Sequence, residues 1–314
     1  MKPGQPSRTA EYMAFFRAYE SARPQGQRLF VDKFARHFIR RSLRVAVWFS
    51  TMPVLGPLVR WYVDRRLPGA RTSAIARTRF IDESICQALR DGLRQFVLLG
   101  AGFDCRAYRL PGISTATVFE VDHPDTLACK LSCLRNLLPQ LPANVRYVQA
   151  DFNREKLPER LAAAGFSSSL PAVFLWEGVT NYLTPEVVDS VLGYVSSCRP
   201  SSRIIFTYVD SGALDGSGCF EGAAKLLRDV AQLGEPWTFG LDPDAVPEFL
   251  SRRGLRLERD ASAQEYRTQC WGTKGQRMNG YNFYHVVIAY VPVPADKTET
   301  MTADQDSALG RPHA

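Results

Sequence analysis

The sequence has no apolar run long enough to cross a membrane as a helix. Its most apolar stretch, from Val45 to Val59, has 15 residues and contains Pro53, Gly56 and Pro57, whereas a spanning helix needs about 20 apolar residues. We expect this stretch to form a buried or lid-like helical segment, with no membrane partner. No charged-then-apolar leader precedes it, so the expected location is the cytoplasm.

Cysteine and histidine are scarce and scattered. The seven cysteines include no Cys-x-x-Cys motif, and the four histidines do not cluster with them. Cys129 and Cys133 are four residues apart, but two thiols do not make a zinc site. The pattern predicts reduced thiols, with neither a metal site nor a disulfide framework.

A concentrated basic run is also missing, although the formal net charge is +7. The arginines are spread thinly from Arg17 to Arg253, without interleaved aromatic residues. This distribution favours a solvated basic surface, or attraction of an acidic small-molecule substrate, over binding to nucleic acid. The sequence gives no indication of the oligomeric state.

Short apolar runs alternate with helical patterns from residue 96 onward. Alternation at this spacing predicts an α/β fold with a largely parallel sheet and helices on both faces. The expected strands are 96–99, 116–121, 145–149, 172–176, 203–209, 255–259 and 282–291. The expected helices are 125–138, 154–164, 185–198, 221–233 and 244–253, and a polar, aromatic loop is expected at 264–281.

Helical patterns also precede the first strand, at 9–22, 28–49 and 73–92, the last with Ser73 as a possible cap and Gly92 as its stop. These segments predict a helical cap over residues 1–92. A core over 93–293 follows, with a substrate-covering insertion at about 211–253. The polar tail at 294–314 is expected to be disordered.

Glycines and acids mark the carboxyl ends of the first two strands. Gly100 and Gly102 let the backbone approach a ligand, because neither residue carries a side chain. Glu120 and Asp122 end the second strand, where a carboxylate can accept both hydroxyls of a ribose. Asp104 lies in the first turn, where its charge would repel the pyrophosphate of a nicotinamide dinucleotide.

Acids mark the next two strand ends as well. Asp151 closes the third strand beside Phe152, where the pair can read an adenine amino group and shield the ring. Glu177 follows the fourth strand and can bind an ammonium or lie under a sulfonium. These acids favour S-adenosylmethionine, which carries no phosphate and has a cationic sulfur, over a dinucleotide.

Five blocks in order resemble the leucine carboxyl methyltransferase family: ARTRFIDE, VLLGAGFDCRAYRL, VFEVDHPDTLACK, VQADF and LWEGVTNYLTPE. That family includes enzymes that methylate the terminal carboxylate of protein phosphatase catalytic subunits, and bacterial members that act on polyketide-type acids. The resemblance spans roughly residues 8–194. It implies a Rossmann-like class I methyltransferase fold, with a seven-stranded, mostly parallel sheet, an antiparallel last strand and S-adenosylmethionine as cofactor.

The resemblance also implies roles for individual residues. Arg77 would grip the carboxylate of the methyl donor, and Tyr182 would lie near the transfer site. The other implied donor contacts are Gly100 and Gly102 at the turn, Asp122 at the ribose, Asp151 and Phe152 at the adenine, and Glu177 at the amine. The chain departs from the family at Cys105, where threonine is frequent, and at Lys33, where proline is typical.

The chemistry of the acceptor depends on whether a base is needed. A carboxylic acid is ionised at neutral pH, whereas a phenol has a pKa of about 10 and usually needs a base. His123 is expected at the ribose end, His285 inside the last strand and His37 in the cap. None is a compelling base, which favours a carboxylate acceptor with cap arginines as its partners; the candidates are Arg17, Arg28 and Arg79.

The leading hypothesis is therefore an S-adenosylmethionine-dependent O-methyltransferase that forms a methyl ester on a small acid, as in specialised metabolism. A second hypothesis keeps the donor and changes the acceptor to a phenol, an enol or a sulfur group. A third is a non-catalytic protein that binds S-adenosylmethionine. A nicotinamide oxidoreductase and a nucleic-acid methyltransferase are further alternatives.

Overall fold

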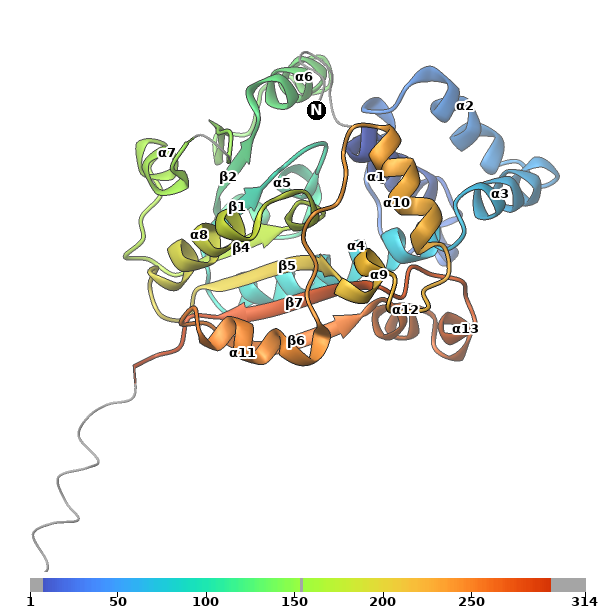
Figure 1. The fold of residues 1–314 in the computed structure, drawn as a ribbon. Helices are drawn as coiled ribbons and strands as arrows, with labels where there is room; N and C mark the ends of the chain where they lie inside the picture. The colour runs from blue at the N-terminus through green and yellow to red at the C-terminus, as the bar shows by residue number, and fades with distance from the viewer. Residues whose placement is uncertain (1–7, 153–154, 295–314) are drawn as a thin grey trace, which may run out of the picture.

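A seven-stranded sheet lies at the centre of the computed structural model, which describes residues 8–152 and 155–294 (Figure 1). The order of strands across the sheet is β3-β2-β1-β4-β5-β7-β6. The strands are β1 (Gln95–Leu99), β2 (Thr117–Asp122), β3 (Val145–Gln149), β4 (Ala172–Trp176), β5 (Arg203–Val209), β6 (Arg256–Ser262) and β7 (Tyr284–Tyr290).

Parallel pairing dominates this sheet, as predicted. β1 pairs in parallel with β2 on one side and with β4 on the other, whereas β7 runs antiparallel between β5 and β6. The strand order therefore reverses between β1 and β4. In open α/β sheets, ligands bind beyond the carboxyl ends of the strands at such a reversal.

Helices cover both faces of the sheet because its central strands are apolar on both sides. Every residue of β1 and β4 is buried. One face packs against α7 (Leu157–Ala163), α8 (Pro185–Ser196) and α11 (Val246–Ser251). The other face packs against α4 (Ala70–Arg90) and α12 (Ala263–Trp271). The remaining helices of the core are α5 (Arg106–Arg109), α6 (Pro124–Arg135), α9 (Ser211–Asp215), α10 (Ala223–Gln232) and α13 (Thr273–Gln276).

The region before β1 is helical, but the helix expected over 28–49 is confirmed only from residue 41 onward. The helices there are α1 (Arg8–Ser21), α2 (Arg41–Ser50) and α3 (Leu55–Arg66), together with α4. Residues 28–40 instead form turns around Asp32, whose carboxylate accepts the backbone N–H groups of Phe34 and Ala35 at 3.1 and 2.9 Å. Such local side-chain bonds compete with helix formation.

Helix α4 begins three residues earlier than expected. Its N-cap is Gly69, in a left-handed conformation with φ of 80°, and Ser73 lies inside the helix. The Ser73 hydroxyl accepts the backbone N–H of Tyr281 at 2.9 Å, so it joins the helix to a distant loop instead of capping it. The predicted stop is confirmed, because the helix ends at Arg90 and Gly92 has a φ of 93°.

The loop expected at 264–281 is wrong over residues 264–276, most of which fold as α12 and α13. Ser262 and Glu265 form a capping box at the start of α12, with the Ser262 N–H bound to Glu265 at 2.7 Å. This spacing is a sequence signature of a helix start. The aromatic and arginine content of the segment obscured it.

The apolar stretch 45–59 is helical, as expected, but much of it is not buried. It spans α2, α3 and their connection. Trp48 of α2 and Leu58 of α3 are each 58% exposed, and Val54 of the connection is 77% exposed. No helix in the described part of the chain is long and apolar enough to cross a membrane. The predicted disordered tail falls, beyond Pro294, outside the described residues.

Candidate active site

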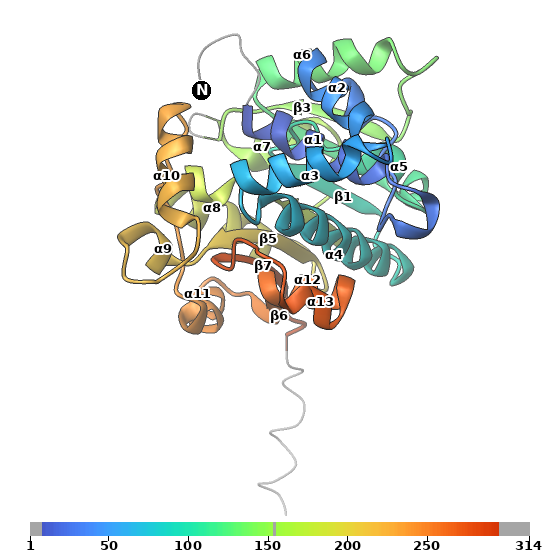
Figure 2. The same cartoon turned by 90° about the vertical axis from the view of Figure 1, so that its right-hand side faces the viewer.

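A cavity of about 1500 Å³ lies beyond the carboxyl ends of β1, β2, β3 and β4. Helices α1 to α4 and the segment around α10 provide its other walls. Figure 2 shows α10 at the same end of the sheet as α1 and α3, although these elements are far apart in the sequence. Because ordinary ligand pockets measure about 300–1,000 Å³, this cavity has room for two ligands side by side.

The turn after β1 brings bare backbone to the cavity wall. Gly100 and Gly102 both line the cavity and both have positive φ, of 68° and 47°. A Cβ at Gly100 would lie 2.5 Å from a methyl carbon of Val179, so the position excludes any side chain. Backbone N–H groups of Gly100 and Ala101 hold the turn against the carbonyl of Val121 at 2.9 and 3.0 Å.

Asp122 lies across this turn at the end of β2, as the sequence predicts. One carboxylate oxygen accepts the backbone N–H of Gly102, and the other accepts that of His123 at 2.6 Å. Burial raises the pKa of the Asp122 carboxyl, and the two backbone donors only partly offset this effect. Each oxygen keeps a lone pair that a ribose hydroxyl can use, because a carboxylate has about four acceptor sites.

Arg77 and Glu177 face each other in the cavity wall, 100 residues apart in the sequence. Nε of Arg77 lies 2.8 Å from Oε1 of Glu177, and the other oxygen of Glu177 lies 2.7 Å from Nη1 of Arg106. Burial alone would raise the pKa of Glu177, but Arg106 and Arg77 outweigh it and lower that pKa. Fixed charges of both signs at one place complement the ammonium and carboxylate of an amino acid.

The charge of Asp104 is not free, contrary to the reasoning from sequence. Its carboxylate pairs with Arg106, a fully buried side chain whose Nε also binds Asp82 at 2.7 Å. Burial alone would raise the pKa of Asp104, but Arg106 and Arg17 lower it to about 2. Asp104 thus helps to fix the arginine that orients Glu177. Because Arg106 balances its charge, Asp104 does not act mainly by repelling a pyrophosphate.

Two further residues singled out in the sequence lie away from the cavity. Glu120 was expected to neighbour the ribose, but it is fully buried and pairs with Nζ of Lys130 at 2.9 Å. Cys105, which replaces a frequent threonine, is also fully buried, with its sulfur 3.3 Å from the carbonyl of Phe103. The substitution at Cys105 therefore does not alter the cavity wall.

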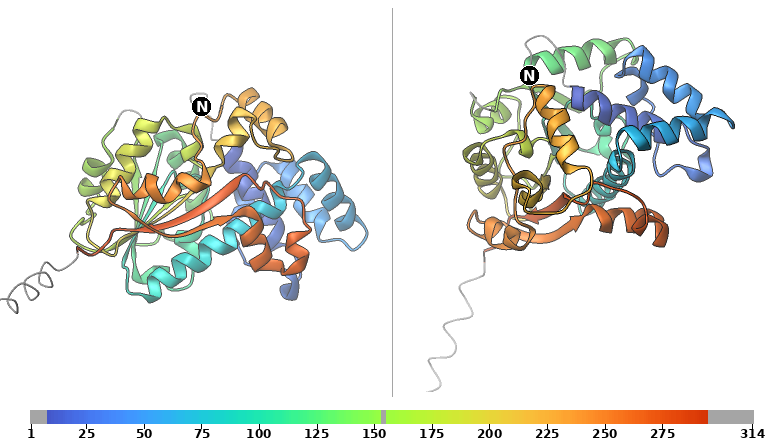
Figure 3. Two further views of the ribbon diagram at one scale, coloured as in Figure 1. Left: turned by 60° about the horizontal axis from the view of Figure 1, so that its bottom comes forward. Right: turned by 45° about the vertical axis from the view of Figure 1, so that its right-hand side comes forward.

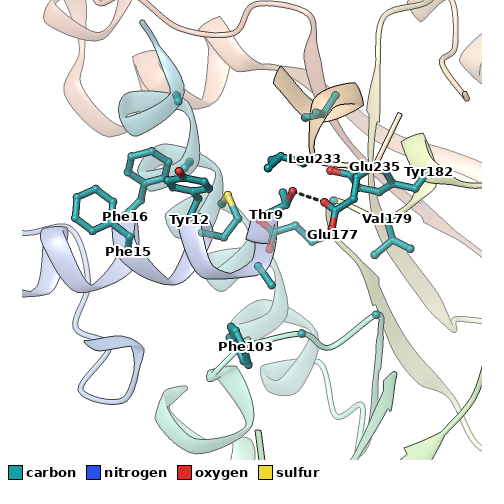
Figure 4. Close-up of a pocket in the computed structure, with 18 of the residues that line it drawn as sticks. Thr9, Tyr12, Phe15, Phe16, Phe103, Glu177, Val179, Tyr182, Leu233 and Glu235 are labelled. Atoms are coloured by element: carbon teal, nitrogen blue, oxygen red, sulfur yellow. Dashed lines mark hydrogen bonds between the residues drawn. The ribbon is translucent and has the colours of Figure 1, made fainter. Parts of the chain in front are cut away.

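The remaining predicted site residues all line the cavity. Asp151 and Phe152 follow β3, directly before the undescribed residues 153 and 154. Tyr182 follows β4 and packs edge-on against Trp237, with ring centroids 6.4 Å apart. Burial raises the pKa of Tyr182, so its phenol stays protonated at neutral pH and can donate a hydrogen bond. Figure 4 shows Tyr182 and Glu177 at the same side of the cavity.

Sequence reasoning missed the residues that close the cavity from above. The Thr9 hydroxyl donates to Glu235 at 2.6 Å and joins α1 to the segment after α10, across 226 residues (Figure 4). Met13 reaches the same wall, with its sulfur 3.7 Å from Nη2 of Arg77. No local pattern could reveal these contacts, because each depends on segments that meet only after folding.

The candidate bases and cap arginines are mostly engaged elsewhere. His285 pairs with Asp260 at 3.1 Å, and neither His285 nor His37 lines the cavity, whereas His123 does. Arg17 lines the cavity, but its guanidinium binds Asp32 at 3.0 Å.

The two other cap arginines also have protein partners and lie outside the cavity wall. Arg79 pairs with Glu83 at 2.6 Å, and Arg28 donates to the carbonyl of Ser21 at 3.4 Å. The structure thus does not support the cap arginines as ligands of the acceptor.

The cysteines form no disulfide in the described part of the chain. All seven cysteines are free. In residues 8–152 and 155–294, no three histidine, cysteine or acidic side chains are grouped to hold a metal ion.

Fold and cavity together define an S-adenosylmethionine-dependent methyltransferase of the Rossmann-like type. Residues 10–196 match the family described as leucine carboxyl methyltransferase. The chain belongs to this family, and S-adenosylmethionine is its cofactor. The cavity residues fit that cofactor. The glycine turn allows it to approach the backbone closely, and the lone pairs of Asp122 can accept the ribose hydroxyls. The Arg77–Glu177 pair complements the amino acid end.

Similar proteins agree with this assignment. A protein of Mycolicibacterium smegmatis, named as an S-adenosyl-L-methionine-dependent methyltransferase, is 32% identical over 79% of this chain and 81% of its own length. A protein of Mycolicibacterium gilvum with the same kind of name is 36% identical over 70% of each chain. A crystal structure from Thermobifida fusca, titled as a methyltransferase, shares the fold at 19% identity, with a TM-score of 0.55 over 93% of this chain and 97% of that one.

Proposed function

We propose that the protein transfers the methyl group to a carboxylate of a small-molecule acid and forms a methyl ester, as in specialised metabolism. The observation that carries this proposal is the Tyr182 phenol, which lies at the same side of the cavity as Glu177 and packs edge-on against Trp237. Burial raises the pKa of Tyr182 and keeps the phenol protonated, although hydrogen bonding from Trp237 opposes the shift. Both side chains line the cavity. The phenol O–H can therefore donate a hydrogen bond to an oxyanion of the acceptor.

S-adenosylmethionine, when bound, supplies a methyl group on a cationic sulfur. Arg77 and Glu177 hold its amino acid end, and Asp122 holds its ribose. Tyr182, supported by Trp237, orients the acceptor carboxylate, which needs no deprotonation because its pKa is about 4. The contact between Thr9 and Glu235 closes the wall above them and excludes water from the reacting atoms.

The proposal predicts a flat pH profile of kcat between about pH 6 and pH 9. The pKa of Tyr182 is raised above 10.0 and that of Glu177 is lowered below 4.5, so neither side chain titrates in this window. A phenol acceptor would instead give a rate that rises towards its own pKa of about 10. Stopped assays with labelled donor at each pH measure the profile.

The acceptor itself is tested with labelled S-adenosylmethionine and a panel of small acids and phenols. A methyl ester releases labelled methanol in mild alkali, whereas an aryl ether does not. Labelled methanol from an acid supports the proposal. Alkali-stable product from a phenol overturns it, and donor binding without any product would favour the non-catalytic hypothesis.

A further inference from the structure

The outer surface of the cap carries a group of exposed apolar side chains on α2, α3 and their connection, which we call the hairpin surface. Six of the nine large apolar side chains that are exposed in residues 8–152 and 155–294 lie here. They are Val45, Trp48, Val54, Leu58, Trp61 and Tyr62, with exposed fractions between 43% and 77%. Both views in Figure 3 show α2 and α3 at the outer edge of the molecule.

Helix α2 mixes arginine with apolar residues on a single exposed face. Arg41, Arg44, Val45 and Trp48 are all exposed and recur at i, i+3, i+4 and i+7, which is the spacing of one helix face. The buried residue of this helix, Val47, packs into the cap on the opposite side. The exposed apolar side chains of α2 therefore do not belong to the hydrophobic core.

Helix α3 repeats the arrangement. Leu58, Trp61, Tyr62 and Arg65 are exposed at the same spacing, while Val63 is buried. The guanidinium of Arg65 lies over the ring of Trp61, with its carbon 5.9 Å from the ring centroid. Tryptophan, tyrosine and arginine are the residues that accumulate where apolar and aqueous phases meet, because each combines an apolar body with a polar end.

The charge of the hairpin surface is strongly positive. Residues 41–66 contain five arginines and one acid, Asp64, and that acid pairs with Arg71 of α4 at 2.7 Å. Arg41, Arg44 and Arg65 have no carboxylate within salt-bridge distance in the described part of the chain. A partner that complements this surface must be apolar and anionic at once.

The mouth of the active-site cavity opens on the same surface. Val45, Leu58 and Tyr62 are exposed and also line the cavity, and Phe49 and Val59 continue the apolar lining inward. An apolar or amphiphilic molecule can therefore pass from the hairpin surface into the cavity along apolar side chains.

We propose that the hairpin surface docks on an anionic lipid bilayer, so that the cavity mouth faces the membrane. The helices lie in the interface without crossing it: apolar side chains enter the acyl boundary, and arginines contact the anionic headgroups. This contact replaces the expectation of no membrane partner. It goes beyond the methyl transfer and does not depend on which acceptor is used.

Sedimentation with lipid vesicles tests the proposal on the full-length protein. Vesicles of phosphatidylglycerol and phosphatidylcholine in equal parts should bind the protein, whereas vesicles of phosphatidylcholine alone should bind it at least about tenfold more weakly. Binding should weaken as salt rises from about 0.1 M to about 0.5 M, because the Debye length shortens. Tryptophan emission should shift to shorter wavelength on binding.

Paired variants localise the contact. Trp48→Ser with Trp61→Ser, and separately Arg44→Gln with Arg65→Gln, should each weaken vesicle binding about tenfold or more. Leu170→Ser and Arg252→Gln, which change an exposed leucine and an exposed arginine elsewhere, should leave it unchanged. None of the four hairpin residues lines the cavity, so affinity for S-adenosylhomocysteine should be kept and reports correct folding.

Three results would overturn the proposal. One is the absence of binding to anionic vesicles by the folded protein. Another is equal loss of binding in the hairpin and control variants. The third is a concentration-dependent dimer that the Trp48→Ser/Trp61→Ser variant abolishes, without vesicle binding, because the hairpin surface would then contact a second copy of the chain. None of these readouts uses turnover, so the result is separate from the outcome for the methyl acceptor.

Discussion

At the scale of single residues, the proposed donor site consists of charges fixed by other charges. Glu177 is held between Arg77 and Arg106, and Arg106 is held in turn by Asp82 and Asp104. A fully buried arginine with three carboxylate partners leaves little freedom for any of them. A donor that binds at this proposed site would meet groups that are oriented before it binds.

Removal of either proposed donor contact should weaken cofactor affinity. Arg77→Ala and Asp122→Ala each remove a charge-assisted contact, which is worth about 1.5–3 kcal/mol, or roughly tenfold to a hundredfold in Kd. Titration calorimetry with S-adenosylhomocysteine measures the change. Asp189→Ala and Arg252→Ala, at exposed ion pairs outside the cavity, serve as controls. Unchanged affinity in both folded site variants would contradict the assigned roles.

Tyr182→Phe should separate catalysis from donor binding. The change removes one hydroxyl and keeps the ring that packs against Trp237. If the hydroxyl binds the acceptor, kcat/KM should fall about fivefold, since a hydrogen bond is worth about 1 kcal/mol. Affinity for S-adenosylhomocysteine should stay the same. A loss of donor affinity with unchanged turnover would instead show that the residue serves the cofactor side.

At the scale of elements, β2 and α6 are joined by a buried ion pair. Glu120 of β2 and Lys130 of α6 are both fully buried and lie 2.9 Å apart, behind the ribose-binding end of the strand. The pair fixes α6 against the edge of β2 that presents Asp122. It supports the donor site without contact with the cavity.

Breaking this pair on one side should cost more stability than removing it completely. Lys130→Met leaves Glu120 buried without a counter-charge and should lower the free energy of unfolding by about 3–5 kcal/mol. Adding Glu120→Gln to that variant should restore part of the loss. Urea denaturation provides the measurement, and Lys156→Met, at an exposed pair with Glu159, should behave as the wild type. Equal losses in the single and double variants would argue against the pair.

At the scale of the whole molecule, three segments that are distant in sequence together form the wall of the cavity. The cap, the strand ends and the segment around α10 all contribute to its wall. A ligand that contacts all three should stabilise the entire fold, because it binds the folded state alone.

S-adenosylhomocysteine should therefore raise the melting temperature. At a ligand concentration of 100 times Kd the gain is about 2.7 kcal/mol, which corresponds to about 4 °C for a chain of this length. NAD at the same concentration should give no shift. Differential scanning calorimetry checks both, and stabilisation by NAD alone would contradict the assignment of the cofactor.

Local sequence patterns were enough to predict the strands of the sheet and their carboxyl ends. Strands at 172–176 and 203–209 coincide with the structure, because their short apolar runs reflect burial on both faces of a strand. The strand at 145–149 also coincides, although only Val145 and Val148 are buried in it. The sequence also placed four residues correctly at the cavity: Gly100, Gly102, Asp122 and Glu177. Each follows or ends a strand, and the carboxyl ends of parallel strands meet at one edge of the sheet. These features depend on neighbours a few residues away.

Which charges stay unpaired and which apolar side chains stay exposed depends on the tertiary structure. Glu120 and Asp122 look equivalent in sequence, yet Lys130 neutralises the first and only backbone N–H groups bind the second. Likewise, the sequence predicted a buried or lid-like segment around Trp48, but no other part of the described chain packs over its exposed apolar residues. Partners far along the chain set both outcomes, because burial and pairing are properties of the packed molecule and not of local periodicity.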